Sequence, residues 1–206
     1  MAFKKKQLAK ILSELKRFKN PKVELEQYVT PGDVAAELLW NAYLRGDIIE
    51  KTVGDLGTGT GVLAIGAMLL GAKKVYALDC DVDALRVAER NAVNLEVNNI
   101  VFVQKDVSFF DQKVDTVVMN PPFGCQNKNA DRPFLEKACE KADVVYSVHL
   151  AQDEVRGFIK RFVEKLGFKV EVFETVSFEI PRQFFFHEKR LERVVVDLYR
   201  FEKKVF

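Results

Sequence analysis

The chain has 206 residues, of which 48% are hydrophobic and 30% are charged, and its formal net charge is +2 at pH 7. This composition excludes an intrinsically disordered or collagen-like chain, and the length suits one domain with a sizeable core. The longest nearly apolar run, residues 61–72, is too short for a membrane span, which requires about 20 residues. We therefore expect a soluble, globular, cytoplasmic protein that does not associate with membranes.

Positive charge is concentrated near the N-terminus. Residues 1–22 hold eight lysines and arginines against Glu14 alone, so this segment carries +7 and the remaining chain carries −5. A basic arm on an acidic body suggests a nucleic-acid partner, although the same charges also fit the solvated face of a helix. The three cysteines, Cys80, Cys125 and Cys139, are odd in number and lack Cys-x-x-Cys spacing, so we expect free thiols and no zinc site.

The expected elements begin with an amphipathic helix over residues 3–19, which Asn20-Pro21 ends. A second helix starts with Thr30 as N-cap and Pro31 as its first residue, and ends at Gly46. From residue 51, five short apolar strands alternate with four helices: strands at 51–56, 74–78, 100–105, 114–119 and 143–148, and helices at 61–70, 82–95, 132–140 and 153–166. Two last strands, 168–176 and 192–201, have only a loop between them. The pattern predicts a mostly parallel sheet covered on both faces, with an antiparallel strand near its end.

A glycine-rich segment, residues 55–61, lies at the end of the first core strand and the start of a helix. Glycines there allow a tight turn and the close approach of a ligand to the backbone. Val62 stands where the dinucleotide fingerprint requires glycine, which disfavours NAD and FAD, and no Gly-Lys-Ser/Thr follows for a phosphate loop. A connection that binds no ligand remains open at this point.

Acidic residues follow three successive strands. Asp79 ends the second strand, where a carboxylate can accept both hydroxyls of a ribose. Asp106 follows the third strand and could accept a hydrogen bond from an adenine amino group, while Asp55 begins the glycine-rich segment. We interpret Asp81 and Asp83 as exposed residues that cap the following helix. The three acids lie at the sheet edge where open α/β proteins bind ligands.

The sequence Asn120-Pro121-Pro122-Phe123 ends the fourth strand. Two prolines stiffen the loop and favour extended geometry in the residues before them, which leaves carbonyl groups pointing outward. An asparagine oxygen beside a fixed carbonyl can accept the two hydrogens of a planar NH2 group, and Phe123 can stack on the ring that carries the amine. A rigid loop with an aromatic plug is the alternative.

These segments, in this order and spacing, resemble the class I S-adenosylmethionine-dependent methyltransferases that modify amines in planar groups. Further segments are similar to the small-subunit ribosomal RNA adenine-N6 methyltransferases of archaea and eukaryotes: residues 26–31, residues 120–124, Tyr146-Ser147-Val148-His149 and Phe186-His187. The likeness extends over about the whole chain. It implies a Rossmann-like, doubly wound α/β fold with a seven-stranded sheet, an N-terminal helical cap (1–50) and a core (51–206) in one domain.

The resemblance also implies the site residues. Cofactor contacts are expected from Gln27, Thr30, Gly57, Thr60, Val62, Asp79, Asp106 and Val107, to which Asp55 and Gly59 of the same loop are added. Gln27 and Thr30 would close over the methionine end, and the catalytic residues would be Asn120, Pro121, Pro122 and Phe123. Thr58 and Thr60 stand where such families often have cysteine. His149 and His187 are further candidates for a role at the site. The alternative for His149 is a polar residue satisfied by its neighbours. The alternative for His187 is a position in a hydrophobic loop that packs on the core.

We therefore predict an enzyme that transfers a methyl group from S-adenosylmethionine to adenine N6 in a structured RNA, expected to be small-subunit ribosomal RNA. The RNA would lie across the basic N-terminal helix and the loop of residues 182–190. The resemblance further implies a small zinc-binding activator protein that adds its strand to the sheet edge. The alternatives are a protein glutamine-N5 methyltransferase, which usually has tyrosine at the position of Phe123, and a non-catalytic RNA-binding module.

Overall fold

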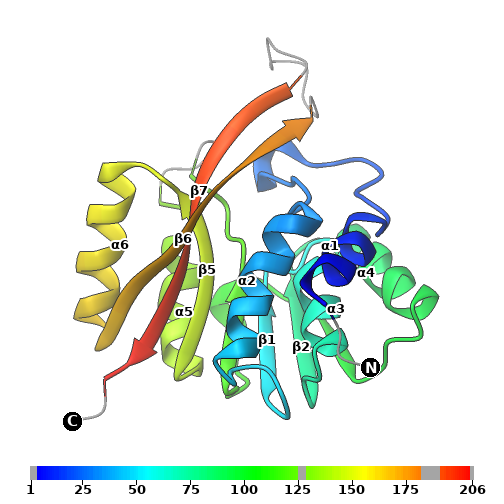
Figure 1. The fold of residues 1–206 in the computed structure, drawn as a ribbon, viewed down its shortest axis with the longest axis horizontal. Coiled ribbons are helices and arrows are strands. Elements are labelled where there is room, and N and C mark those ends of the chain that lie inside the picture. The colour runs from blue at the N-terminus through cyan, green and yellow to red at the C-terminus, as the bar shows by residue number, and fades with distance from the viewer. Residues whose placement is uncertain (1–3, 125–128, 182–190, 205–206) are drawn as a thin grey trace.

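The computed structural model describes residues 4–124, 129–181 and 191–204, which form a seven-stranded sheet flanked by helices (Figure 1). The strand order is β3-β2-β1-β4-β5-β7-β6, and every neighbouring pair is parallel except the two that β7 forms with β5 and β6. The strands are β1 (Thr52–Leu56), β2 (Lys74–Asp79), β3 (Ile100–Gln104), β4 (Thr116–Met119), β5 (Val144–Leu150), β6 (Phe168–Pro181) and β7 (Leu191–Lys203). The predicted mixed sheet is therefore confirmed.

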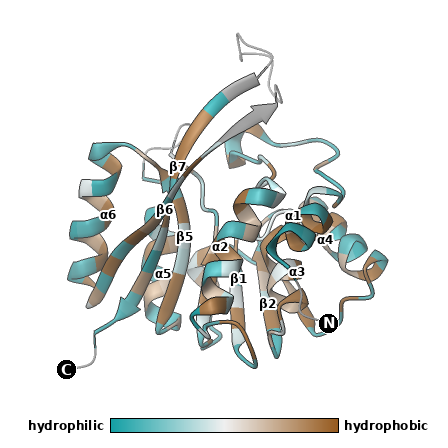
Figure 2. Ribbon diagram, viewed as in Figure 1, coloured by the Kyte–Doolittle hydropathy of each residue, from teal (hydrophilic) through white to brown (hydrophobic). Residues whose placement is uncertain are grey.

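The helices cover both faces of the sheet through two hydrophobic clusters. The helices α1 (Lys5–Ser13), α2 (Gly32–Leu44), α3 (Val62–Leu69) and α4 (Val82–Asn94) contribute to the cluster on one face. On the other face lie the helices α5 (Arg132–Lys141) and α6 (Asp153–Lys165). Figure 2 shows mostly hydrophobic residues along β2 and β5, whereas α1, α4 and α6 carry both hydrophobic and hydrophilic residues. This two-sided burial explains why the central strands are apolar without alternation.

The order of strands reverses beside β1, and this reversal positions the site. The chain leaves β1 toward α3 on one face, whereas it leaves β4 toward α5 on the opposite face. The register aligns Leu56, the last residue of β1, with Leu78 and Met119 on the neighbouring strands. The loops after these strands therefore diverge around a crevice, which is where open α/β sheets bind ligands.

Two boundaries near the N-terminus differ from those predicted. The first helix ends at Ser13 and does not reach residue 19, because the backbone of Lys16 is held by the side chain of Asn91, through N–H···Oδ1 and Nδ2–H···O contacts of 3.0 Å each. The second helix begins at Gly32 with Pro31 as N-cap, and no side chain caps it. The predicted N-cap role of Thr30 is therefore wrong, since its hydroxyl oxygen accepts a hydrogen bond from Asn120 instead.

The last two strands form a hairpin longer than the sequence pattern indicated. β6 continues to Pro181, and its pairing with β7 shifts register between Val172 and Glu174. Figure 1 shows this hairpin extending beyond the other strands. None of the helices in the described part of the chain has the length and apolar character that crossing a membrane requires.

Candidate active site

A cavity of about 240 Å³ lies at the carboxyl ends of the central strands. All ten residues predicted to bind a cofactor line it: Gln27, Thr30, Asp55, Gly57, Gly59, Thr60, Val62, Asp79, Asp106 and Val107. Of the four predicted catalytic residues, Asn120 and Pro122 line the cavity, whereas Pro121 and Phe123 lie outside its lining. The fold thus brings together segments that are up to about 95 residues apart in the chain.

The glycine-rich loop forms one wall of the cavity. The backbone N–H groups of Gly57 and Thr58 both donate to the carbonyl of Leu78, which fastens the loop to the end of β2. Gly59 has a φ of 54°, a left-handed conformation that favours glycine, and a Cβ atom there would lie 3.0 Å from the ring of Phe18. The glycine therefore permits both the turn and the close packing of Phe18, which also lines the cavity.

Asp55 is a buried carboxylate with one unused oxygen. Its Oδ2 accepts hydrogen bonds from the hydroxyl of Thr58 at 2.6 Å and from the N–H of Ala64 at 2.9 Å. Its Oδ1 is buried and has no hydrogen-bond partner among the residues that the structure describes. Burial raises the pKa of Asp55 to about 7, although the two hydrogen bonds oppose that shift. Asp55 also lines the cavity, so this carboxylate would lie beside a ligand bound there.

Asp79, at the end of β2, connects the glycine-rich loop to the residues that follow this strand. Its Oδ2 accepts from the N–H of Gly59 at 2.8 Å, and its Oδ1 accepts from the N–H of Asp81 at 2.9 Å. Burial raises the pKa of Asp79 above its ordinary value. Each carboxylate oxygen has a further lone pair, so both can also accept hydrogen bonds from a diol.

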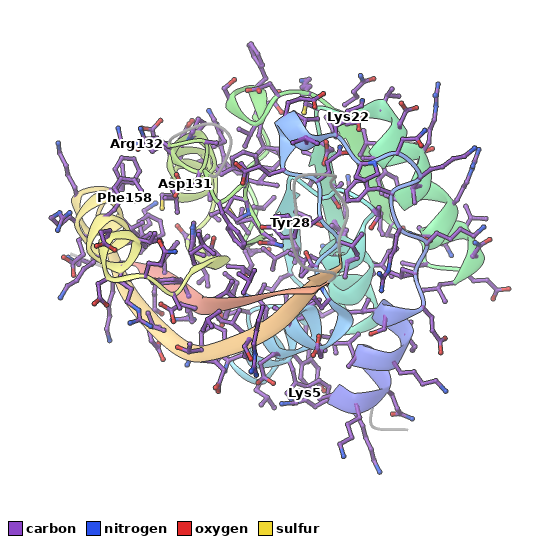
Figure 3. The ribbon with its side chains drawn as sticks, turned by 90° about the horizontal axis from the view of Figure 1, so that it is seen from above. Lys5, Lys22, Tyr28, Asp131, Arg132 and Phe158 are labelled. Atoms are coloured by element: carbon purple, nitrogen blue, oxygen red, sulfur yellow. The ribbon has the colours of Figure 1, made fainter. Side chains whose placement is uncertain are left out.

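Asp81 is buried and does more than cap α4, which corrects the prediction of an exposed residue. It accepts from the N–H of Asp83 as the N-cap, and its two oxygens also receive Lys22 Nζ and Gln27 Nε2, each at 2.7 Å. Burial alone would raise the pKa of Asp81, but these hydrogen bonds lower it. The contacts tie the segment before α2 to the second strand end, and Figure 3 shows Lys22 and Tyr28 in this segment.

Asn120 is held by the same N-terminal segment. Its Nδ2 donates to the hydroxyl oxygen of Thr30 at 2.9 Å, and its Oδ1 accepts from the hydroxyl of Tyr28 at 3.3 Å. The ring of Tyr28 lies against the ring of Phe123 with centroids 5.1 Å apart, and the N–H of Phe123 donates to Glu26 at 2.7 Å. Residues 26–30 therefore hold the Asn-Pro-Pro-Phe loop through hydrogen bonds and a ring contact, and the ring of Phe123 packs against Tyr28.

His149 does not line the cavity. It is buried, with Nε2 at 2.7 Å from the hydroxyl of Ser147 and Nδ1 at 3.8 Å from a carboxylate oxygen of Asp131. Burial lowers the pKa of His149 to about 3, so the ring is neutral at ordinary pH. This environment is that of a satisfied core histidine, the alternative recognised in the sequence.

Several predictions concern residues that the structure does not describe. His187, Cys125 and the basic and aromatic loop of residues 182–190 lie outside the described residues. Cys80 and Cys139 are both free thiols, Cys80 exposed and Cys139 buried. Among the residues placed by the structure, no group of three or more His, Cys, Asp or Glu side chains could hold a metal ion.

Sequence reasoning missed three residues at the site. The sequence pattern places Phe18 within the predicted helix over residues 3–19, and it places Tyr28 within residues 26–31 without a role of its own. Asp81 was interpreted as an exposed cap. The signal for Phe18 and Tyr28 was faint, because a single aromatic in a polar segment has no periodicity. The interaction of Asp81 with Lys22 and Gln27 spans more than 50 residues, so it had no local signal.

Comparisons with known proteins identify the family. The model of the ribosomal protein L11 methyltransferase (PrmA) family matches residues 40–121. The rRNA N(6)-adenosine-methyltransferase METTL5 of Danio rerio is 38% identical over 205 residues, which cover 96% of this chain and 98% of the relative. The uncharacterised protein MJ0284 of Methanocaldococcus jannaschii is also 38% identical and covers 98% of this chain and 96% of the relative.

A solved structure agrees with this relationship. The crystal structure of an RNA methyltransferase candidate, PH1948 from Pyrococcus horikoshii, is 56% identical, matches with a TM-score of 0.94 and covers 100% of both chains. The predicted resemblance is thereby confirmed along the full length. The chain belongs to the METTL5 family of rRNA N(6)-adenosine-methyltransferases.

Proposed function

We propose that this protein transfers a methyl group from S-adenosylmethionine to the N6 amine of adenosine in ribosomal RNA. The observation that carries the proposal is its full-length relationship to named rRNA N(6)-adenosine-methyltransferases, together with an Asn-Pro-Pro-Phe loop at the edge of the cavity. The more specific expectation, that the substrate is small-subunit ribosomal RNA, rests on the sequence resemblance. A ribosomal substrate agrees with the cytoplasmic location that the sequence suggests.

The cavity suits an adenosine that carries an amino acid. The unpartnered Oδ1 of buried Asp55 can accept a hydrogen bond from an α-ammonium group. Asp79 offers two carboxylate oxygens to the ribose hydroxyls, and Asp106 and Val107, which also line the cavity, would hold the adenine. The lining glycines leave room for a ligand beside the backbone. These residues fit S-adenosylmethionine, and we propose that they bind it.

The bound cofactor supplies an electrophilic methyl group. Asn120 Oδ1 and the carbonyl of Pro121 would accept the two hydrogens of the adenine amine, which draws the nitrogen toward tetrahedral geometry and exposes its lone pair. Pro122 stiffens the loop, so little reorganisation is required when the substrate arrives. The adenine must leave its stack to reach the pocket, and Phe123 would stack on it from the loop. Since Phe123 packs on Tyr28, both rings would form one aromatic platform.

RNA would bind through the basic N-terminal segment. Lys4, Lys6 and Lys10 are exposed on or beside α1, while Lys5 pairs with Glu37 at 2.6 Å. Lys16, Arg17 and Lys19 are exposed on either side of Phe18, which lines the cavity. Positive charge therefore extends from α1 to the edge of the cavity. Such charges bind phosphates without reading sequence, and the attraction weakens as salt screens it.

A methylation assay tests the function directly. Purified protein is incubated with tritiated S-adenosylmethionine and either small-subunit ribosomal RNA or a protein extract, and the labelled RNA is digested to nucleosides. We expect label in N6-methyladenosine, and label that is lower by about 100-fold or more with the Asn120→Ala variant at equal concentration. Label in protein glutamine with every RNA unlabelled would replace the proposal by the glutamine-N5 alternative. Failure to label either fraction, with RNA still bound, would favour a non-catalytic RNA-binding module.

We also propose that a small zinc-binding activator protein binds this chain, and this proposal rests on the sequence resemblance. β3 pairs only with β2 among the described strands, and Val101 on it is 38% exposed, so this strand has an edge to which a partner strand can add. The zinc would belong to the partner. A monodisperse chain with full activity alone would show that no activator is needed.

A further inference from the structure

We propose that Arg132, held against two phenylalanine rings of α6, binds a phosphate of the RNA beside the target adenosine. With this contact and the basic N-terminal segment, the RNA is held on both sides of the nucleotide that enters the cavity. The inference rests on the proposed function and deepens it, because it assigns a second RNA contact to residues outside the cavity lining.

Arg132 belongs to a cation–aromatic cluster between α5 and α6. Its guanidinium carbon lies 5.1 Å from the ring centre of Phe158 and 6.0 Å from that of Phe162, and the two ring centres are 5.2 Å apart. Distances of this size are typical of cation–π interactions. Both rings are half-buried against the hydrophobic cluster on this face of the sheet, whereas Arg132 is exposed. The rings therefore restrict the position of a cation that faces solvent.

Within the described part of the chain, the guanidinium N–H groups of Arg132 have no hydrogen-bond or ion-pair partner. The carboxylate of the preceding residue, Asp131, is turned toward buried His149, with Oδ2 3.8 Å from Nδ1. A guanidinium carries its N–H donors in a planar fork that matches two oxygens of a phosphate. Because the rings already restrict the side chain and its donors are unused, Arg132 can bind a phosphate with a small loss of conformational freedom.

The cluster lies next to the cavity, on the side away from the N-terminal segment. Ala130 and Phe134 line the cavity and flank Arg132 in the chain. Residues two positions apart on a helix point in directions about 200° apart, so Arg132 projects toward α6 while Phe134 faces the cavity. In the view of Figure 3, Tyr28 lies between Lys22 on the right and Arg132 on the left. An RNA strand that leaves the cavity over the first turn of α5 therefore reaches Arg132.

The charge distribution of the chain gives a reason for a second contact. Residues 1–22 carry +7, whereas residues 23–206 carry a net charge of −5. The N-terminal segment attracts phosphates on one side of the cavity, but the acidic body repels the RNA that continues beyond it. A cation beside the cavity on the far side offsets this repulsion. The phenylalanine rings hold that cation without a carboxylate, which would compete with the phosphate for the same N–H groups.

The experiment measures binding of the full chain to small-subunit ribosomal RNA by filter binding over a range of KCl concentrations. Arg132→Gln should weaken binding about tenfold, the effect of one charge-assisted hydrogen bond. It should also reduce the slope of log K against log salt concentration by about 0.7–0.9, the contribution of one phosphate contact. Arg132→Lys should keep the slope, because it keeps the charge, but should bind more weakly than the wild type, since it lacks the planar fork. The dissociation constant of S-adenosylhomocysteine should be the same in both variants.

Two matched variants separate this contact from a general effect of charge. Lys160→Gln removes an exposed cation from a different face of α6, two residues from Phe158, and should leave both the affinity and the slope nearly unchanged. Phe158→Leu keeps an apolar side chain but removes the ring, so it should weaken RNA binding about threefold in the wild type. In the Arg132→Gln background Phe158→Leu should have no further effect, because the ring acts through the arginine.

The outcomes distinguish this contact from the proposed function. Equal losses of affinity in Arg132→Gln and Lys160→Gln, or a salt slope that Arg132→Gln leaves unchanged, would overturn the contact, while methylation of the RNA by the wild type would still support the proposed function. If Phe158→Leu does not fold, the comparison of Arg132→Gln with Lys160→Gln decides the question. A wild-type protein that does not bind ribosomal RNA would overturn the proposed function and this contact together.

Discussion

The Asp55 carboxylate, whose Oδ1 has no partner among the described residues, predicts that cofactor affinity depends on pH. Burial raises its pKa to about 7 in the free protein, so the group is protonated below that pH. A ligand ammonium beside Oδ1 favours the charged form and lowers this pKa on binding. Binding therefore releases a proton below pH 7, and affinity rises with pH until the free carboxylate is already ionised. Above pH 7 the affinity becomes constant.

The magnitude follows from the size of the shift. One pKa unit corresponds to about 1.4 kcal/mol, so each pH unit below 7 should weaken binding about tenfold while the carboxylate stays ionised in the complex. Between pH 7 and pH 5 the dissociation constant of S-adenosylhomocysteine should therefore rise about 100-fold. The α-ammonium and the ligand carboxylate keep their charges across this range, so they contribute no slope of their own.

Isothermal titration calorimetry at half-unit steps from pH 5 to pH 8 measures this dependence. Repeating the titration at pH 6 in buffers of different ionisation enthalpy counts the released protons, and we expect nearly one. 5′-Methylthioadenosine is the control ligand, since it keeps the adenosine and lacks the ammonium; its residual slope reports Asp79, whose pKa burial also raises. Asp55→Asn should bind S-adenosylhomocysteine with the same shallow slope as the control ligand.

Two results would refute this reasoning. One is an S-adenosylhomocysteine affinity that stays constant from pH 5 to pH 7 in a protein that remains folded. The other is the same steep slope for 5′-methylthioadenosine, because the titrating group would then respond to the adenosine and not to the amino acid.

Four further outcomes are expected. Asp79→Ala should weaken cofactor binding about tenfold or more in calorimetry, because the ribose hydroxyls lose a charged acceptor; unchanged affinity in a folded variant would remove Asp79 from the site. Asn120→Ala should lower kcat about 100-fold or more, as expected for the loss of one preorganised polar contact, and should leave the cofactor dissociation constant unchanged. If turnover and cofactor binding were both lost in a folded variant, the role of Asn120 would be misassigned. Replacing Lys4, Lys5 and Lys6 together by alanine should weaken RNA binding and flatten its salt dependence in filter-binding assays, with cofactor affinity unchanged, whereas Phe123→Leu should lower methyl transfer more than RNA binding, by about 1–3 kcal/mol.

The sequence by itself determined the sheet, because its signals are local. Short apolar strands alternating with amphipathic helices specify a parallel sheet covered on both faces, and only a loop separates the last two strands. The glycine-rich segment and the acids at the carboxyl ends of β1 and β2 could be located for the same reason. Parallel strands place their carboxyl ends at one edge, so residues that follow several strands must meet there.

Only the tertiary structure decided how residues 14–31 are used. Lys16 meets Asn91 and Lys22 meets Asp81 across separations of 75 and 59 residues, and these contacts end the first helix early and bury a predicted surface acid. Thr30 carries a strong local signal as an N-cap, yet its hydroxyl oxygen receives Asn120 from 90 residues away. A hydroxyl can satisfy either partner, and the choice depends on which groups packing brings within hydrogen-bond distance. Local propensity describes the use of the Thr30 hydroxyl as an N-cap. The hydrogen bond from Asn120 exists only once the sheet has formed.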